Sequence, residues 1–104
     1  MKFHHIGIPT IERKEGAIFS EASQLHITNP DNHPYRIEWL RFEPGSPMPK
    51  LLQEAPHLAF AVEDVEAAVE GKDVLVAPKT LPNGIRIAFI IEDGVPIEFM
   101  EVDA

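Results

Sequence analysis

Two histidines and two glutamates occupy matching places in the two halves of this 104-residue chain. The matching phrases are His5-Ile6-Gly7-Ile8 with His57-Leu58-Ala59-Phe60, and Ile37-Glu38-Trp39 with Ile97-Glu98-Phe99. Two imidazoles and two carboxylates together suit a divalent ion of zinc, nickel, cobalt, iron or manganese. We therefore predict that a duplicated unit closes around one metal ion, with His5, Glu38, His57 and Glu98 as its ligands.

Such a site would have a clear chemical use, which makes Glu38 and Glu98 the candidate catalytic residues. A divalent ion polarises a carbonyl oxygen, and a loosely held glutamate can take a proton from the neighbouring carbon. A glutamate flanked by apolar residues also needs a cation or hydrogen-bond donors, because an isolated buried carboxylate is costly. An alternative is that the two glutamates form ordinary salt bridges with Arg36, Arg41 or Arg86.

Two further side chains are candidates for binding a substrate. By strand alternation we expect Arg86 and His26 to face the same side as the proposed ligands. Arg86 could then hold a carboxylate or another anion, and His26 could contact the substrate. The alternative for Arg86 is a charge at the rim of the sheet.

The elements that must position these residues are clearest in the second half, which has the order β-α-β-β-β. Its strands are expected over 57–62, 74–77, 85–91 and 96–102, and its helix over 65–70. Asp64 is a suitable N-cap for that helix, and Gly71 is suited to ending it. The first half fits the same order with its helix reduced to a remnant over 11–17. Its strands are expected over 3–8, 24–28 and 35–42, and one turn of helix over 51–54.

Period-two alternation assigns faces to these strands. In the strand that begins at His57, Leu58 and Phe60 should pack under the helix, while His57 and Ala59 face the other way. The same alternation places His5, Glu38 and Glu98 on the face that carries small residues, opposite a bulky apolar face. All four proposed ligands are thus expected to line one cavity.

Length and composition limit the class of protein. The size of 104 residues indicates one domain, with a first module over 1–43, a proline-rich connector over 44–55 and a second module over 56–104. A net charge of -8 argues against nucleic acid and anionic membrane surfaces as partners, because both are polyanions. The absence of cysteine excludes disulfides and thiolate chemistry. We expect a cytoplasmic protein that binds a small molecule and pairs as a homodimer.

The pattern resembles the vicinal oxygen chelate superfamily, which includes glyoxalase I, methylmalonyl-CoA epimerase, extradiol dioxygenases and bleomycin resistance proteins. The resemblance lies in His5-Ile6-Gly7-Ile8, in the run from Pro56 to Val65, and in the run from Gly94 to Glu101. It implies an α+β fold in which two paired βαβββ modules form a cupped mixed sheet around a divalent metal. It also implies ligands from the first and last strands of each module, and the set is most similar to that of glyoxalase I.

The resemblance implies a metal-dependent lyase or isomerase of the glyoxalase type, acting on a small carbonyl or hydroxy-acid substrate. The alternative is a protein that binds a small molecule without chemistry, as bleomycin resistance proteins do. Residues that hold glutathione or coenzyme A in the family have no recognisable counterpart in this sequence.

Overall fold

The structure, a computed structural model, describes residues 1–102, which divide into two compact units. One unit is His5–Pro56, and the other combines Met1–His4 with the chain from His57 onward. The elements in chain order are β1 (Lys2–Pro9), β2 (Ile18–Ser20), β3 (Leu25–Ile27), the 3-10 turn η1 (Pro30–Asn32), β4 (Ile37–Phe42), α1 (Lys50–Glu54), β5 (His57–Ala61), α2 (Val65–Ala68), β6 (Asp73–Thr80), β7 (Arg86–Glu92) and β8 (Val95–Met100).

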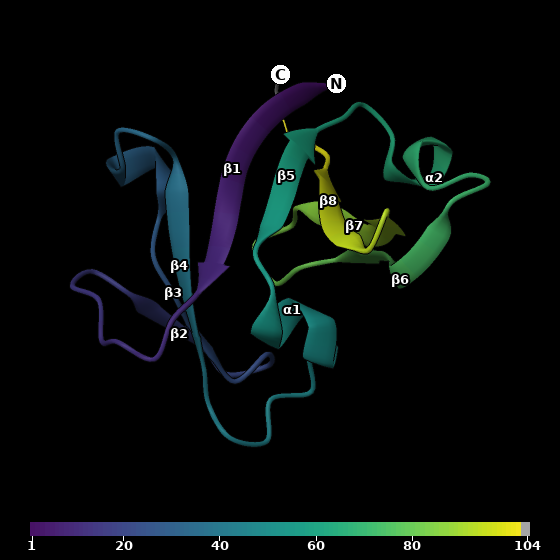
Figure 1. Cartoon of the computed structure of the whole chain (residues 1–104). Coiled ribbons are helices and arrows are strands. Elements are labelled where there is room, and N and C mark those ends of the chain that lie inside the picture. The colour runs from purple at the N-terminus through teal and green to yellow at the C-terminus, as the bar shows by residue number, and fades with distance from the viewer. Residues whose placement is uncertain (103–104) are drawn as a thin grey trace. The chain divides into compact units, whose positions relative to one another are not determined.

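The two halves of the chain share one strand topology (Figure 1). The spatial order is β2-β3-β4-β1 in the first half and β6-β7-β8-β5 in the second. The first and last strands of each half, β1 with β4 and β5 with β8, pair in parallel, and the other neighbours are antiparallel. The predicted α+β class with two modules of this plan is confirmed.

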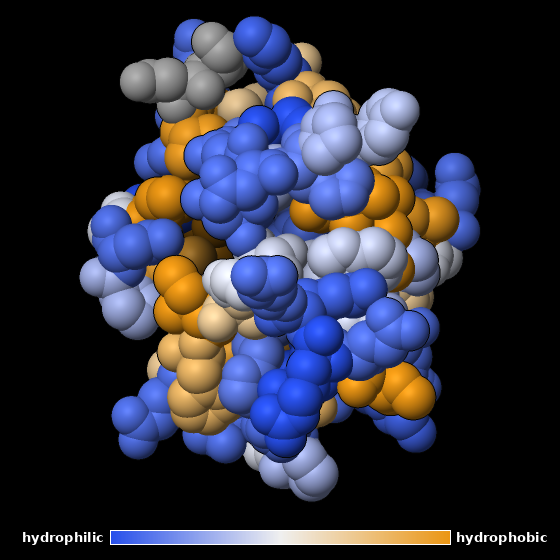
Figure 2. Space-filling view, turned by 90° about the vertical axis from the view of Figure 1, so that its left-hand side faces the viewer, coloured by the Kyte–Doolittle hydropathy of each residue, from blue (hydrophilic) through white to orange (hydrophobic). Residues whose placement is uncertain are grey.

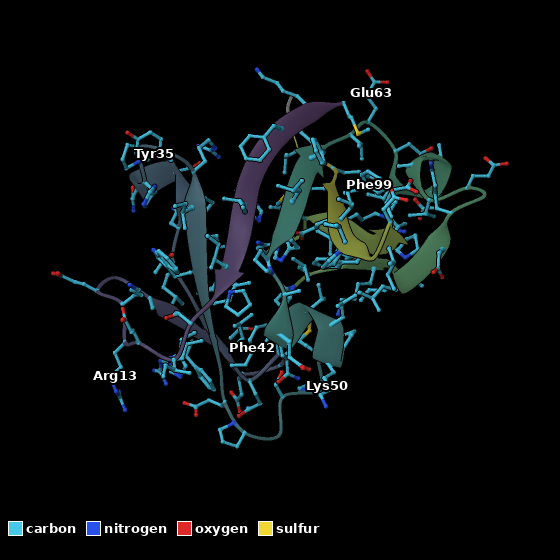
Figure 3. All side chains as sticks on the ribbon, viewed as in Figure 1. Arg13, Tyr35, Phe42, Lys50, Glu63 and Phe99 are labelled. Carbon is cyan, nitrogen blue, oxygen red and sulfur yellow. The ribbon has the colours of Figure 1, made fainter. Side chains whose placement is uncertain are left out.

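The helix of the second half, α2, packs on one face of its sheet. Val65, Ala88, Ile90 and Phe99 form the buried core there, and Figure 3 shows Phe99 between β8 and α2. Phe60 packs against the same core, as its place in the alternation predicts. The predicted packed face of the second half is therefore confirmed for Phe60 and Phe99, and the opposite face is the one that carries His57 and Glu98.

The N-terminus of α2 is capped by two carboxylates. Asp64 accepts hydrogen bonds from the backbone N–H groups of Glu66 and Ala67 at 3.0 and 3.3 Å. Glu101 accepts a third, from the N–H of Val65 at 2.9 Å. These bonds satisfy donors that the first turn of a helix cannot pair internally. The predicted N-cap at Asp64 is thus confirmed.

Two local predictions differ from the structure, and one short strand was not predicted. Residues 11–17 form turns and no helix, and Gly16 has a positive φ of 81° that a helix excludes. The strand expected to end before Pro78 continues to Thr80, because β6 is an edge strand and tolerates proline. The three-residue strand β2 was not predicted, since so short a segment gives no periodicity.

Neither α-helix within residues 1–102 has the length and apolar character needed to cross a bilayer.

Candidate metal-binding site

The first unit brings His5 and Glu38 together. In the parallel pair of β1 and β4, Gly7 is the direct partner of Glu38. Since side chains alternate along a strand, His5 shares a face with Gly7 and therefore with Glu38. The His5 Nε2 and Glu38 Oε1 atoms are 3.3 Å apart, and the residues are 1% and 9% exposed.

The second unit repeats this arrangement with His57 and Glu98. Ala59 is the direct partner of Glu98 in the parallel pair of β5 and β8. The His57 Nε2 and Glu98 Oε1 atoms are 3.2 Å apart, and the residues are 4% and 7% exposed. In both halves the glutamate thus lies opposite the small residue two positions after the histidine.

The two pairs fit the requirements of a divalent metal. Metal–nitrogen and metal–oxygen bonds of about 2.0 to 2.2 Å place adjacent ligand atoms roughly 3.0 to 3.4 Å apart. The separations of 3.3 and 3.2 Å within the pairs lie in that range. Imidazole and carboxylate are also the donor types that zinc and its neighbours accept. Each unit by itself therefore supplies two donors at the spacing of adjacent ligands; the four-ligand set stays a prediction.

Phe89 is a neighbour of the second pair that the sequence reasoning missed. It is the direct partner of Glu98 in the antiparallel pair of β7 and β8. Its ring meets the His57 imidazole edge-on, with 5.2 Å between ring centroids and 79° between planes. The sequence feature that could have identified this neighbour is the Asp93-Gly94 dipeptide. It is typical of a two-residue hairpin turn with positive φ at both positions, and such a turn fixes how the flanking strands pair. Both do have positive φ, 53° and 79°, and such a turn sets the register between Phe89 and Glu98.

The expected direction of Arg86 is wrong. Because Phe89 is opposite Glu98, alternation puts Arg86 on the other face of β7, the face that α2 covers. Its guanidinium donates to a carboxylate oxygen of Glu66 in α2, and to the Thr80 hydroxyl at 3.1 Å. Arg86 therefore ties α2 to the edge of its own sheet.

The expected direction of His26 is also wrong. His26 pairs with Arg41 across β3 and β4, which places both on the face of β4 opposite Glu38. Its Nε2 is 2.8 Å from Glu43 Oε1, and this hydrogen bond is the main cause that lowers the pKa of the Glu43 carboxyl. Arg41 Nη1 is 3.6 Å from the same Glu43 oxygen. The alternative that Arg41 or Arg86 pairs with the proposed ligands is therefore wrong as well.

Comparisons with known proteins give matches only among solved structures. No protein-family model matches the sequence, and no curated protein matches it. A hypothetical protein from Bacillus halodurans C-125 superposes with a TM-score of 0.74 and 21% identity, over 99% of this chain and 95% of that one. Methylmalonyl-CoA epimerase from Mycobacterium tuberculosis superposes with a TM-score of 0.65 and 16% identity, over 99% and 89%. The chain thus shares its fold with both of these solved structures.

Proposed function

We propose that the two His–Glu pairs close on one divalent metal ion and that the protein is a metal-dependent isomerase or lyase. The observation that carries this proposal is the repeated register of the pairs. His5 with Glu38 and His57 with Glu98 show the same strand positions and nearly the same separations, 3.3 and 3.2 Å. Two unrelated His–Glu pairs would not be expected to share the same strand positions, the same separation and the same burial in both halves.

The donor set supports a small carbonyl or hydroxy-acid substrate. When bound, the metal would supply charge that acidifies the carbon next to a carbonyl or hydroxyl oxygen of the substrate. His5 and His57 would hold it through Nε2. Glu38 or Glu98 would take the proton from that carbon with a carboxylate oxygen that is not bound to the metal, and would return it to the same or the adjacent carbon. A small carbonyl or hydroxy-acid substrate provides this arrangement of oxygen and acidic hydrogen.

The reaction type is supported by the fold and the ligand set. One of the structures that share the fold is named an epimerase, which is a kind of isomerase. The His-Glu-His-Glu set is most similar to that of glyoxalase I, and this supports a glyoxalase-type substrate as the finer proposal. The homodimer expected from the size of the chain stays a prediction.

The test is exchange of the substrate hydrogen with solvent. The metal-loaded protein is incubated in D2O with the hemithioacetal of methylglyoxal and, separately, with a methylmalonyl thioester, and deuterium incorporation is followed by NMR. We expect exchange that depends on the metal, and a loss of about 100-fold or more when the acting base is changed by Glu38→Gln or Glu98→Gln. His33→Ala, in the turn after η1, is the matched control and should leave exchange unchanged.

The binding alternative has its own signature in the same experiment. If a compound of the panel raises the melting temperature of the metal-loaded protein but is never exchanged or converted, the protein sequesters the ligand without chemistry. That result would remove the enzymatic proposal and leave the metal site in place. If the protein neither exchanges the substrate hydrogen nor binds metal, the enzymatic proposal and the metal site are both wrong.

A further inference from the structure

A polar pocket lies within the first unit, on the face of its sheet opposite Glu38. Its volume is about 210 Å³. It is lined by three strand residues, His26, Trp39 and Arg41, and by Thr10, Glu12, Arg13, Lys14 and Ala17 from the segment that follows β1. The strand residues share a face because His26 is the direct partner of Arg41 and Trp39 lies two positions before Arg41.

The pocket lies where the first half has turns over 11–17 in place of the expected helix. In the second half α2 covers the corresponding face and fills it with Val65. In the first half the segment 10–17 runs over β4 as turns, anchored by a hydrogen bond of 2.8 Å from the Thr10 N–H to the Leu40 carbonyl oxygen. The Lys14 Nζ lies 4.3 Å from the centre of the Trp39 ring. The turns over 11–17 thus border a polar pocket, at the place where the second half has a packed apolar core.

The lining is basic in an acidic protein. It holds three of the nine lysines and arginines of the chain but one of its seventeen acidic residues. That carboxylate, Glu12, is paired with Lys14 at 2.9 Å. Beside the lining, Glu43 lies 2.8 Å from His26 Nε2 and 3.6 Å from Arg41 Nη1, so a bound anion would share Arg41 with this carboxylate. The Arg41 side chain is only 18% exposed. Arg13 also lines the pocket but is exposed, and Figure 3 shows its side chain extending outward from the loop. Figure 2, which views the side of β2 to β4, shows strongly hydrophilic residues gathered on this face.

We propose that this pocket binds a small organic oxyanion, a carboxylate or a phosphate ester. Arg41 and Arg13 would take its charge through charge-assisted hydrogen bonds, and the Thr10 hydroxyl would donate to it. Trp39 and Ala17 supply the apolar surface for the organic part. The available volume admits a group about the size of a substituted benzene ring. This site is separate from the metal-binding proposal and uses none of the four proposed ligands.

Trp39 provides a direct readout, because it is the one tryptophan of the chain. Metal-free protein is titrated with benzoate, phenyl phosphate, acetate, inorganic phosphate and the neutral benzyl alcohol while Trp39 emission is recorded. We expect saturable changes with benzoate or phenyl phosphate, at concentrations at least tenfold lower than for acetate or inorganic phosphate. The preferred probe of the two identifies the oxyanion as a carboxylate or a phosphate. Equal affinity for benzyl alcohol, or no saturable change with any anion, would overturn the proposal.

Charge-removing variants locate the binding. Arg41→Gln and Arg13→Gln should each weaken the affinity for the preferred probe by about tenfold, the loss expected when one charged hydrogen-bond donor is removed. Lys50→Gln removes an equal charge from an exposed position of the same unit and should leave the affinity unchanged. If all three variants weaken the affinity for the probe equally, the probe responds only to the overall charge of the protein. That result would contradict binding in the pocket.

His57→Ala separates this inference from the proposed function. That variant should lose the metal site and keep the Trp39 response to the probe. Loss of both in a protein that circular dichroism shows to be folded would place the anion at the metal-binding residues and overturn the second site.

Discussion

The ring of Phe89 stands edge-on to the imidazole of His57, 5.2 Å away between centroids, and it is also the strand partner of Glu98. A buried phenyl ring thus contacts one proposed ligand and is the strand partner of the other, and we expect it to restrict the orientation of the His57 ring. Phe89→Ala should lower the free energy of unfolding by about 3 to 5 kcal/mol, since Phe89 is 5% exposed. It should also weaken metal binding, because His57 loses the surface that restricts its rotamers. Phe89→Leu should give a smaller loss of both. Urea unfolding and zinc titration measure the two effects, and unchanged metal affinity in a folded Phe89→Ala protein would contradict the orienting role.

The small residue opposite each glutamate leads to a second prediction. Ala59 is fully buried and is the direct partner of Glu98. Ala59→Leu should cost about 1 to 3 kcal/mol of stability through overpacking and should displace the Glu98 carboxylate, so that metal affinity falls. Ala67→Leu, an exposed position on α2, is the control and should change neither. Zinc affinity that survives in a folded Ala59→Leu protein would show that this register does not position Glu98.

The fold of the second half could be predicted from the sequence because its signals are local. Asp64 as N-cap and the alternation from His57 each depend on neighbouring residues, and both agree with the structure. The faces of Arg86 and His26 could not be obtained in the same way, because they depend on the register between antiparallel strands. For β7 and β8 the two-residue Asp93-Gly94 turn could have fixed that register.

No short turn connects β3 and β4, so their pairing register could not be fixed in the same way. The connection between them runs through η1 and spans residues 28–36, which leaves the register open in the sequence. The duplicated His and Glu phrases were visible because they repeat in order, and the structure pairs them within each half. The pocket over Trp39 could not be anticipated, since it results from the missing helix and from turns that carry no periodic signal.

The hydrogen bond between His26 and Glu43 predicts a pH effect on stability. It is the main cause that lowers the folded-state pKa of Glu43 below its ordinary value of 4.5. A lowered carboxyl pKa means that the stabilisation is fully present above the unfolded-state value and is lost as the pH falls through the folded-state value. Glu43→Gln and His26→Gln should therefore each flatten the fall of unfolding free energy on acidification below about pH 4.5. Urea melts from pH 6 to pH 3 measure it, and slopes equal to the wild type in both variants would contradict the pair.

The cap of α2 should matter for stability and not for the metal. Asp64→Ala removes the acceptor for two backbone N–H groups and should lower the free energy of unfolding by about 1 kcal/mol, and Asp64→Asn by less. Metal affinity should stay at the wild-type value, because α2 packs on the face away from Glu98. Thermal unfolding with and without zinc measures both quantities. A loss of metal affinity in Asp64→Ala would mean that the two faces of this sheet are coupled.

The metal content of single-histidine variants tests the central claim most directly. Purified protein is stripped of metal, reconstituted with zinc, dialysed and analysed by mass spectrometry for zinc per chain, as wild type, His5→Ala, His57→Ala and the control His33→Ala. If both His–Glu pairs close on one ion, the wild type and His33→Ala hold one zinc per chain, and His5→Ala and His57→Ala both lose it. Two zinc ions per wild-type chain, or a tightly held ion that remains in His57→Ala, would show that the pairs act separately and would contradict the account.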